Sequence, residues 1–155
     1  MSHSWDKKEE IMKHVVFIGH RDCYGLSASQ IETAIRACIC QGSTEFYSGG
    51  QGAFDRLCAR CVFELKKEFP QIRNILVIPY LSFSVFNPAL FDDILFPEEL
   101  EQLPFKAAIP RRNQYMVKQA SVAVCYISHT WGNAFKTYTL AQKKGMKIIN
   151  LTRLS

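Results

Sequence analysis

Five short apolar runs recur along the chain, and segments with the spacing of amphipathic helices lie between them. The runs cover residues 14–18, 45–47, 74–79, 122–127 and 147–151, and all but the second are rich in β-branched residues. Continuously apolar strands that alternate with helices are typical of a parallel sheet covered on both faces. The sequence therefore predicts an α/β fold: an open, three-layer, Rossmann-like sandwich with a mostly parallel sheet.

The length and composition fit one globular domain. The chain has 155 residues, of which 48% are hydrophobic and 21% charged. We expect a polar tail over residues 1–13 and a single domain over residues 14–155. No apolar run approaches the ~20 residues that a membrane span needs, and the first ten residues lack the apolar core of a signal peptide. A cytoplasmic protein without a membrane partner is therefore expected.

The stretch from residue 80 to about residue 109 interrupts the alternation. It holds five phenylalanines and three prolines, and it is too long for a plain connection. It either covers a ligand site or forms a dimer surface, because exposed aromatic patches mark contact sites, or it packs back onto its own sheet. Both alternatives stay open. Residues 97–100 are expected to form a short helical turn.

The cysteines are placed like core residues. Cys38 and Cys40 fall inside one helix pattern, and Cys58 and Cys61 inside another. Structural zinc sites instead place such pairs in turns, and cysteine is among the most buried residue types. We expect reduced structural thiols, no metal site and no cofactor, with metal or redox chemistry as the weaker alternative.

Helix starts are predicted from capping patterns. Ser29 followed by Glu32 has the spacing of a capping box, so the first helix is expected to begin near Ser27 or Ser29. Pro110 is expected to occupy the first turn of a later helix.

Three glycines within four residues follow the second predicted strand and lead into a helix. This glycine loop, Ser48 to Gly52, contains Gly49, Gly50 and Gly52. Such a turn gathers backbone N–H groups beside the positive end of the helix dipole, where a phosphate or another anion binds. Glycine also lets a ligand approach the backbone closely. Asp55 in the first helical turn either stabilises the helix end or accepts hydrogen bonds from a ribose.

Two further loops are expected to meet the glycine loop, because ligands of open α/β sheets bind beyond the carboxyl ends of the strands. The candidate ligand contacts in these loops are Gly19, His20, Arg21, Gly132, Asn133 and Thr137. Arg21 would bind an anionic ligand or pair with a nearby acid. Trp131 would stack on a base or cap the core.

The helix expected at Pro110 carries two arginines, Arg111 and Arg112, followed by Asn113. Two cations at a helix start oppose the dipole, so at least one of them is expected to bind a phosphate or carboxylate. The alternative is a surface ion pair with the acids of residues 98–101, which would contribute little.

Four segments in this order resemble the SLOG superfamily, the Rossmann-like group named for the Smf/DprA DNA-processing proteins and the Lonely-guy enzymes. Residues 17–21 (FIGHR) are similar to its F-T-G-H-R opening, and residues 47–55 (YSGGQGAFD) to its GG-x-x-G-x-D loop. Residues 111–117 (RRNQYMV) resemble its R-N-x-x-M-V helix, and residues 131–141 its second glycine turn. The similarity spans about residues 14–151 and is closest to small bacterial members of the DUF1273/YpsA-like type.

The resemblance implies a nucleotide or nucleotide-derived ligand at the glycine loops, and a homodimer. The Lonely-guy branch hydrolyses the N-glycosidic bond of cytokinin nucleotides with the glutamate of a PGGxGTxxE motif and an arginine of the preceding helix. This chain has Gly132-Asn133-Ala134 in place of the glycine pair and threonine, and Lys136-Thr137 where the acid is expected. It therefore departs from the branch at the carboxylate that glycosidic cleavage normally needs.

The first hypothesis is accordingly the binding of a nucleotide or a nucleotide-derived small molecule. Arg21 and Arg112 would neutralise a phosphate in the glycine loop, and Asp55 and Asn113 would contact the sugar. The first alternative is a phosphoribohydrolase-like enzyme acting on nucleoside monophosphates, with Asp55 and Arg112 as catalytic residues. The second is a DNA-processing accessory protein. Its support is weaker, since the net charge of +5 is mild and no basic groove with interleaved aromatics is evident.

Overall fold

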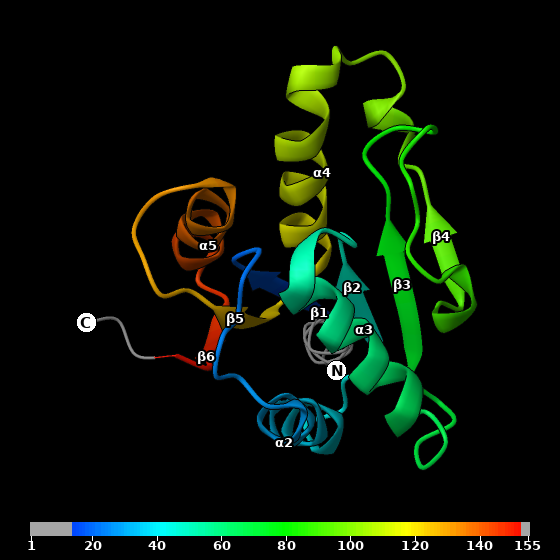
Figure 1. The fold of residues 1–155 in the computed structure, drawn as a ribbon, viewed down its shortest axis with the longest axis vertical. Helices are drawn as coiled ribbons and strands as arrows, with labels where there is room; N and C mark the ends of the chain where they lie inside the picture. Colours follow the sequence, from blue (N-terminus) through cyan, green and yellow to red (C-terminus); the bar gives the residue numbers. More distant parts are fainter. Residues whose placement is uncertain (1–13, 153–155) are drawn as a thin grey trace, which may run out of the picture.

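All strands of the computed structural model, which describes residues 14–152, belong to one parallel sheet (Figure 1). The strands are β1 (His14–Gly19), β2 (Glu45–Ser48), β3 (Arg73–Val77), β4 (Asp93–Leu95), β5 (Val122–Tyr126) and β6 (Lys147–Asn150). Their order is β4-β3-β2-β1-β5-β6, and every neighbouring pair is parallel. The predicted Rossmann-like α/β fold is confirmed, whereas the tail expected over residues 1–13 lies outside the described residues.

Helices cover both faces of this sheet (Figure 1). They are α2 (Ala28–Cys40), α3 (Gly52–Leu65), α4 (Phe105–Gln119) and α5 (Asn133–Lys144). Val15 and Phe17 of β1 pack with α2 and α3, while Val16 and Ile18 pack with α4 and α5. Because successive strand residues point to opposite faces, a strand buried on both sides needs the unbroken apolar run found in the sequence.

The first helix begins directly after Ser27, the earlier of the two predicted starts, and not at the Ser29 of the Ser29–Glu32 pattern. Ser27 is the N-cap, with an extended backbone (φ −98°, ψ 155°), and it forms a capping box with Gln30. Ser29 is already inside the helix. Ser27–Gln30 and Ser29–Glu32 both have the spacing of a capping box, and the extended backbone of Ser27 identifies Ser27 as the N-cap.

The expectation that Pro110 opens a helix is wrong. Helix α4 begins at Phe105 with Pro104 as N-cap, and the Ala107 N–H donates to the Pro104 carbonyl. Pro110 lies in the second turn, where its ring removes one helical N–H donor. Arg111 and Arg112 are therefore in the middle of α4, and the dipole argument for an anion beside them does not apply.

Part of the 80–109 segment packs back onto its own sheet, which was one alternative to its covering a ligand site or forming a dimer surface. Its strand β4 pairs with β3, in register from Ile75 opposite Asp93 to Val77 opposite Leu95. Two short 3-10 turns flank this strand, η1 (Pro88–Leu90) and η2 (Glu98–Leu100), and the second confirms the turn predicted at residues 97–100.

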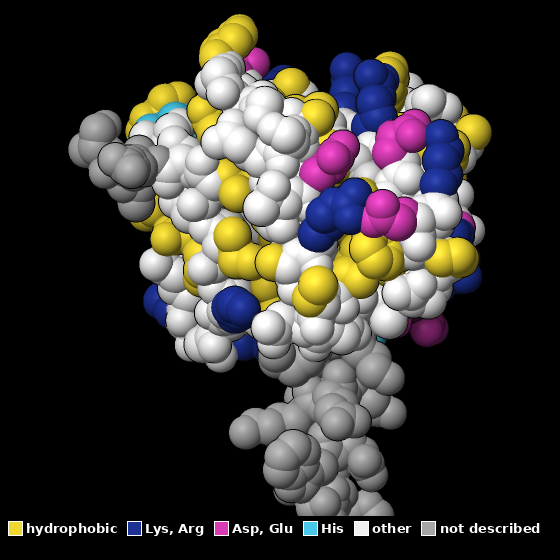
Figure 2. All heavy atoms as spheres, turned by 90° about the horizontal axis from the view of Figure 1, so that it is seen from below, with side chains coloured by type: hydrophobic (Ala, Val, Ile, Leu, Met, Phe, Trp, Pro, Cys, Tyr) yellow, Lys and Arg dark blue, Asp and Glu magenta, His cyan; other side chains and the backbone are white. Residues whose placement is uncertain are grey.

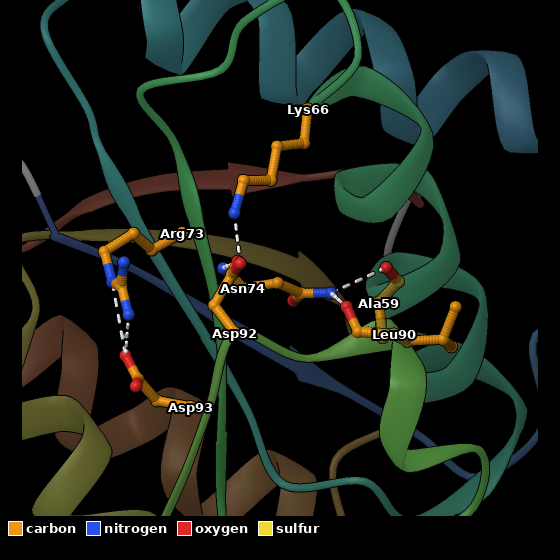
Figure 3. Close-up of polar contacts among 7 residues, drawn as sticks. All are labelled: Ala59, Lys66, Arg73, Asn74, Leu90, Asp92 and Asp93. Carbon is orange, nitrogen blue, oxygen red and sulfur yellow. Dashed lines mark hydrogen bonds and ion pairs between the residues drawn. The ribbon is translucent and has the colours of Figure 1, made fainter.

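A buried asparagine anchors this segment to the rest of the fold (Figure 3). The Nδ2 of Asn74 donates to the carbonyls of Ala59 in α3 and Leu90 in η1, both at 2.9 Å. The N–H of Asn74 donates to Asp92 at 2.7 Å, and Asp92 also pairs with Lys66. One side chain thus joins a helix, a central strand and the edge of the sheet.

The cysteines of the core behave as small apolar side chains. Cys38, Cys58, Cys61 and Cys125 are buried and form no disulfide. Burial raises the pKa of the Cys38 and Cys61 thiols to about 11 and that of Cys125 to about 12. These thiols therefore stay protonated at neutral pH.

Cations and carboxylates are mixed on the face drawn in Figure 2, where they lie beside one another between apolar side chains. A face of this kind does not present the block of positive charge that polyanion binding favours. Among the helices that the structure describes, none is long and apolar enough to cross a membrane.

Candidate functional site

A cavity of about 670 Å³, here called the cleft, lies where β1, β2 and β5 end. The strand order changes direction between β1 and β5, which is where open α/β sheets bind their ligands. The loops that follow these three strands line it, together with one side of α4 and the start of α5. Its volume falls within the range of small-molecule sites. The parallel topology thus brings the three loops together as expected.

The structure divides the predicted site residues into three groups. Those that line the cleft are Gly19, His20, Arg21, Gly49, Asp55, Arg112, Asn113, Gly132, Asn133 and Thr137. Gly50 and Gly52 line a second cavity of about 410 Å³ on the other side of the glycine loop, which Arg21 also borders. Ser48 and Arg111 line neither cavity: Ser48 is buried, and Arg111 is exposed on α4.

Arg112 lies beneath the glycine loop with only 1% of its surface exposed. Its Nη1 donates to the carbonyls of Gly49 and Val77, both at 2.9 Å. Its Nη2 donates to Oε1 of Gln51 at 2.7 Å, and its Nε to Oδ1 of Asn113 at 2.9 Å. Burial lowers the pKa of Arg112 to about 10. The guanidinium therefore stays charged at neutral pH and holds the loop in place, and within residues 14–152 four of its five N–H groups have a protein acceptor.

Asp55 is the second buried charge at the base of the cleft. Its Oδ2 accepts the N–H of Gln51 at 2.9 Å. Burial raises the pKa of this carboxyl to about 6, although the hydrogen bond from Gln51 and the charge of Arg112 act in the opposite direction. A carboxyl that titrates this close to neutrality inside a cleft is suited to proton transfer or to accepting a ligand hydroxyl.

Two glycines of the site are fixed by close packing within the protein. A Cβ on Gly49 would lie 2.7 Å from Cζ of Arg112, and a Cβ on Gly19 would lie 2.1 Å from the ring of Phe54. The glycine at position 49 thus makes room for the guanidinium. This is a different reason from the one the sequence suggested, which was close approach of a ligand.

Three aromatic rings from two loops form a continuous column in the cleft. The ring centroids of His20 and His129 are 3.5 Å apart with planes at 14°, and those of His129 and Trp131 are 3.7 Å apart at 21°. The N–H of His129 donates to Nε2 of His20 at 3.3 Å, so that nitrogen carries no proton. Burial, followed by the neighbouring His129, lowers the pKa of His20. The column runs from buried His20 to Trp131, which is 70% exposed.

Sequence reasoning did not select several residues that line the cleft, among them Tyr24, Gln51, Tyr126 and His129. Gln51 lies inside the glycine loop, where the predicted contacts came from the glycines and Ser48. His129 contacts His20, which lies 109 residues earlier in the sequence. No local sequence pattern predicts a contact between residues so far apart. Tyr126 is joined to the same region, since its hydroxyl donates to the carbonyl of Tyr24 at 3.2 Å.

Comparison with known proteins identifies the fold. No protein-family model and no curated protein matches the chain. Among solved structures, DNA processing protein A from Helicobacter pylori is 18% identical, with a TM-score of 0.62 over 92% of this chain and 66% of its own. DNA processing protein A (DprA) from Streptococcus pneumoniae is 19% identical, with a TM-score of 0.62 over 90% of this chain and 50% of its own.

The Helicobacter structure describes a single-stranded DNA binding mode of that protein. At these identities the similarity shows the fold alone, and the chain spans 66% and half of the two relatives. The resemblance to the Smf/DprA group is thereby confirmed at the level of the fold. The finer assignment to the DUF1273/YpsA-like type stays a prediction. The chain is similar in fold to DprA proteins, with its cleft at the strand switch point that such a fold provides.

Proposed function

We propose that the cleft binds a nucleotide or a nucleotide-derived small molecule. The observation that carries this proposal is the combination of groups around one cavity of nucleotide size. Gly49 and Gln51 of the glycine loop, the cationic Arg21 and an exposed indole, Trp131, all line it. A phosphate binds cationic and backbone N–H groups, and a base stacks on an aromatic ring.

The charges in the cleft favour Arg21 as the phosphate contact. The charged residues that line it are Arg21, Asp22, Asp55 and Arg112. Arg112 has four of its five N–H groups bound to the protein. The side chain of Arg21 is exposed, and no ion pair holds it within residues 14–152. An unpaired guanidinium beside backbone donors suits bidentate phosphate binding.

Calorimetric titration with AMP and with ADP-ribose tests this proposal. Wild type should bind at least one of them, and Arg21→Ala should bind it about tenfold more weakly, because a charge-assisted hydrogen bond is lost. Arg60→Ala, which removes an exposed arginine of α3 outside both cavities, is the matched control and should bind as wild type does. Absence of binding at millimolar concentration would contradict the proposal.

A second candidate, binding of single-stranded nucleic acid, is favoured by the second cavity. Arg21, Asp22 and Gln51 border both cavities, and Arg56 and Phe83 extend the second one. Arg56 lies over the ring of Phe86, with Cζ 4.5 Å from the ring centroid. A strand longer than one nucleotide would follow this path across the glycine loop, in line with the DprA structural neighbours.

Thymidylate oligomers of one to eight nucleotides separate this candidate from the first. Affinity that rises with length and falls steeply with salt indicates a strand. In that case Arg56→Ala should weaken the longer oligomers and leave the mononucleotide unchanged. A length-independent affinity would favour a mononucleotide ligand.

The hydrolase alternative keeps one supporting observation, the pKa of about 6 at Asp55. A carboxylic acid of this kind would protonate the departing base while water adds to the sugar carbon. Release of adenine from AMP, lost in Asp55→Asn, would establish that activity.

A further inference from the structure

The proposed phosphate contacts do not involve the column of rings formed by His20, His129 and Trp131. Each ring lies close to parallel with the next, at centroid distances of 3.5 and 3.7 Å. These are the distances of face-to-face aromatic stacking. The inner ring, His20, is 7% exposed and the outer ring, Trp131, is 70% exposed, so the outer end is the more accessible to a ligand.

The outer face of Trp131 is open. One face of the indole is covered by His129, and in the described part of the chain no other ring or cation stacks on the indole. The side chain nevertheless lines the cleft. A large aromatic side chain exposed in this way beside polar cleft walls is a preferred contact for a planar ring of a ligand.

The backbone of the loop that carries the indole is constrained on both sides. Gly132, the next residue, has φ +92° and is the N-cap of α5. A residue with a Cβ is strained at this backbone angle even though the space around Gly132 is open. On the other side, the hydrogen bond from the His129 N–H to His20 ties the loop to the end of β1. The column is therefore built by two independent constraints rather than by the indole alone.

We infer that Trp131 is the base-stacking platform of the cleft, on which the nucleobase of the ligand extends the column of His20 and His129 by one further ring. This inference rests on the proposed function and adds the place of the base to it. It separates the cleft into a base end at Trp131 and a phosphate end at Arg21. The base end recognises any planar base face, since stacking on an indole requires no particular pattern of donors and acceptors.

The test uses AMP and ribose 5-phosphate, which share the sugar phosphate and differ in the base. The sequence holds two tryptophans, so Trp5→Phe makes Trp131 the only indole and its fluorescence a direct reporter. AMP should quench this fluorescence. Trp131→Ala should bind AMP at least about tenfold more weakly by calorimetry, while its affinity for ribose 5-phosphate stays unchanged.

Two further variants complete the experiment. Trp131→Phe should regain most of the lost affinity, because a smaller ring still stacks. Phe63→Ala, which removes a partly exposed ring of α3 outside both cavities, should bind AMP as wild type does. If Trp131→Ala binds AMP as tightly as wild type, the platform is refuted while nucleotide binding stands. If wild type binds none of AMP, ADP-ribose and ribose 5-phosphate, both proposals fail together.

Discussion

Two polar networks in this molecule have the same hydrogen-bond arrangement but lie in regions with different roles. In each, one buried side chain donates hydrogen bonds to two backbone carbonyls of separate elements: Asn74 to Ala59 and Leu90, and Arg112 to Gly49 and Val77. The Asn74 network lies at the edge of the sheet and uses a neutral amide. The Arg112 network lies under the cleft and uses a charge, with a second charge on Asp55 beside it.

The difference is that buried charges, which cost free energy to desolvate, lie beneath the cleft and not in the network at the sheet edge. A neutral amide satisfies two carbonyls without burying a charge. A buried guanidinium and a buried carboxylate are expensive to desolvate, and an apolar pair of similar size often stabilises a fold as well or better. The pair at the cleft is therefore better explained by what it does there, which is to fix the glycine loop and to leave a titratable group in the cavity.

The largest effect is expected from Arg112→Ala. This variant leaves the Gly49 and Val77 carbonyls without their donor and Asp55 without its nearby cation, and each buried polar group left unpaired costs about 1–3 kcal/mol. Denaturant unfolding measures it. Because the loop itself would move, loss of ligand binding in this variant would not identify Arg112 as a ligand contact. A cost below about 1 kcal/mol would show that the network is dispensable.

The next effect depends on pH and comes from Asp55. Its folded pKa of about 6 lies above the ordinary aspartate pKa of 3.8, so the folded state holds the proton more tightly than the unfolded state. Stability from this group is present below pH 4 and is lost as the pH rises through about 6, a change on the order of 2–3 kcal/mol. Asp55→Asn should flatten this part of the stability profile. An unchanged profile would contradict the assignment.

His20 changes stability in the opposite direction. Its folded pKa is lowered, so its contribution is present above the unfolded pKa of 6.5 and is lost as the pH falls. A His20→Gln variant should therefore be less sensitive to mild acid than wild type. The two single variants, followed by urea unfolding from pH 4 to 8, separate the two contributions.

Asn74→Ala should cost about 1–3 kcal/mol, less than Arg112→Ala, because it leaves two carbonyls without a donor but no buried carboxylate without a nearby cation. Its specific signature is local: amide hydrogen exchange in β4 should accelerate, while exchange in β5 and β6 stays slow. Equal acceleration throughout the sheet would show that Asn74 supports the whole fold rather than its edge.

The smallest stability effect is expected from Trp131→Ala. The side chain is 70% exposed, so its removal should change the unfolding free energy by no more than about 0.5 kcal/mol. Thermal unfolding checks this. A large loss would mean that the column of rings is part of the core, and the ligand-binding experiments on this variant would then need the Trp131→Phe protein instead.

The sequence predicted most of the fold because apolar runs and helix periodicity are local signals. Val15 to Ile18 lie in a strand that is buried on both faces, and their unbroken apolar sequence predicts such a strand. Strand β4 was missed because it has only three residues, one of them an aspartate, at the edge of the sheet. Pro110 misled the helix boundary since a proline is more common in a first turn than in a second.

The site was less predictable than the fold. The strand-end loops could be foreseen from the parallel topology, but the state of each side chain depends on distant partners. Arg112 is buried because Val77 of β3 and Gly49 of the glycine loop present carbonyls to it, 35 and 63 residues away. The stack of His20 on His129 likewise joins two loops that only the folded sheet brings together.

Binding of a nucleotide in the cleft is tested most directly by titrating the isotopically labelled protein with AMP and following the backbone amide resonances. The largest shifts should fall in three loops: residues 19–22, 49–52 and 128–133. The amides of β4 and α2 should not move. Shifts centred on β4, on α2 or on the face drawn in Figure 2, with the three loops unchanged, would contradict binding in the cleft.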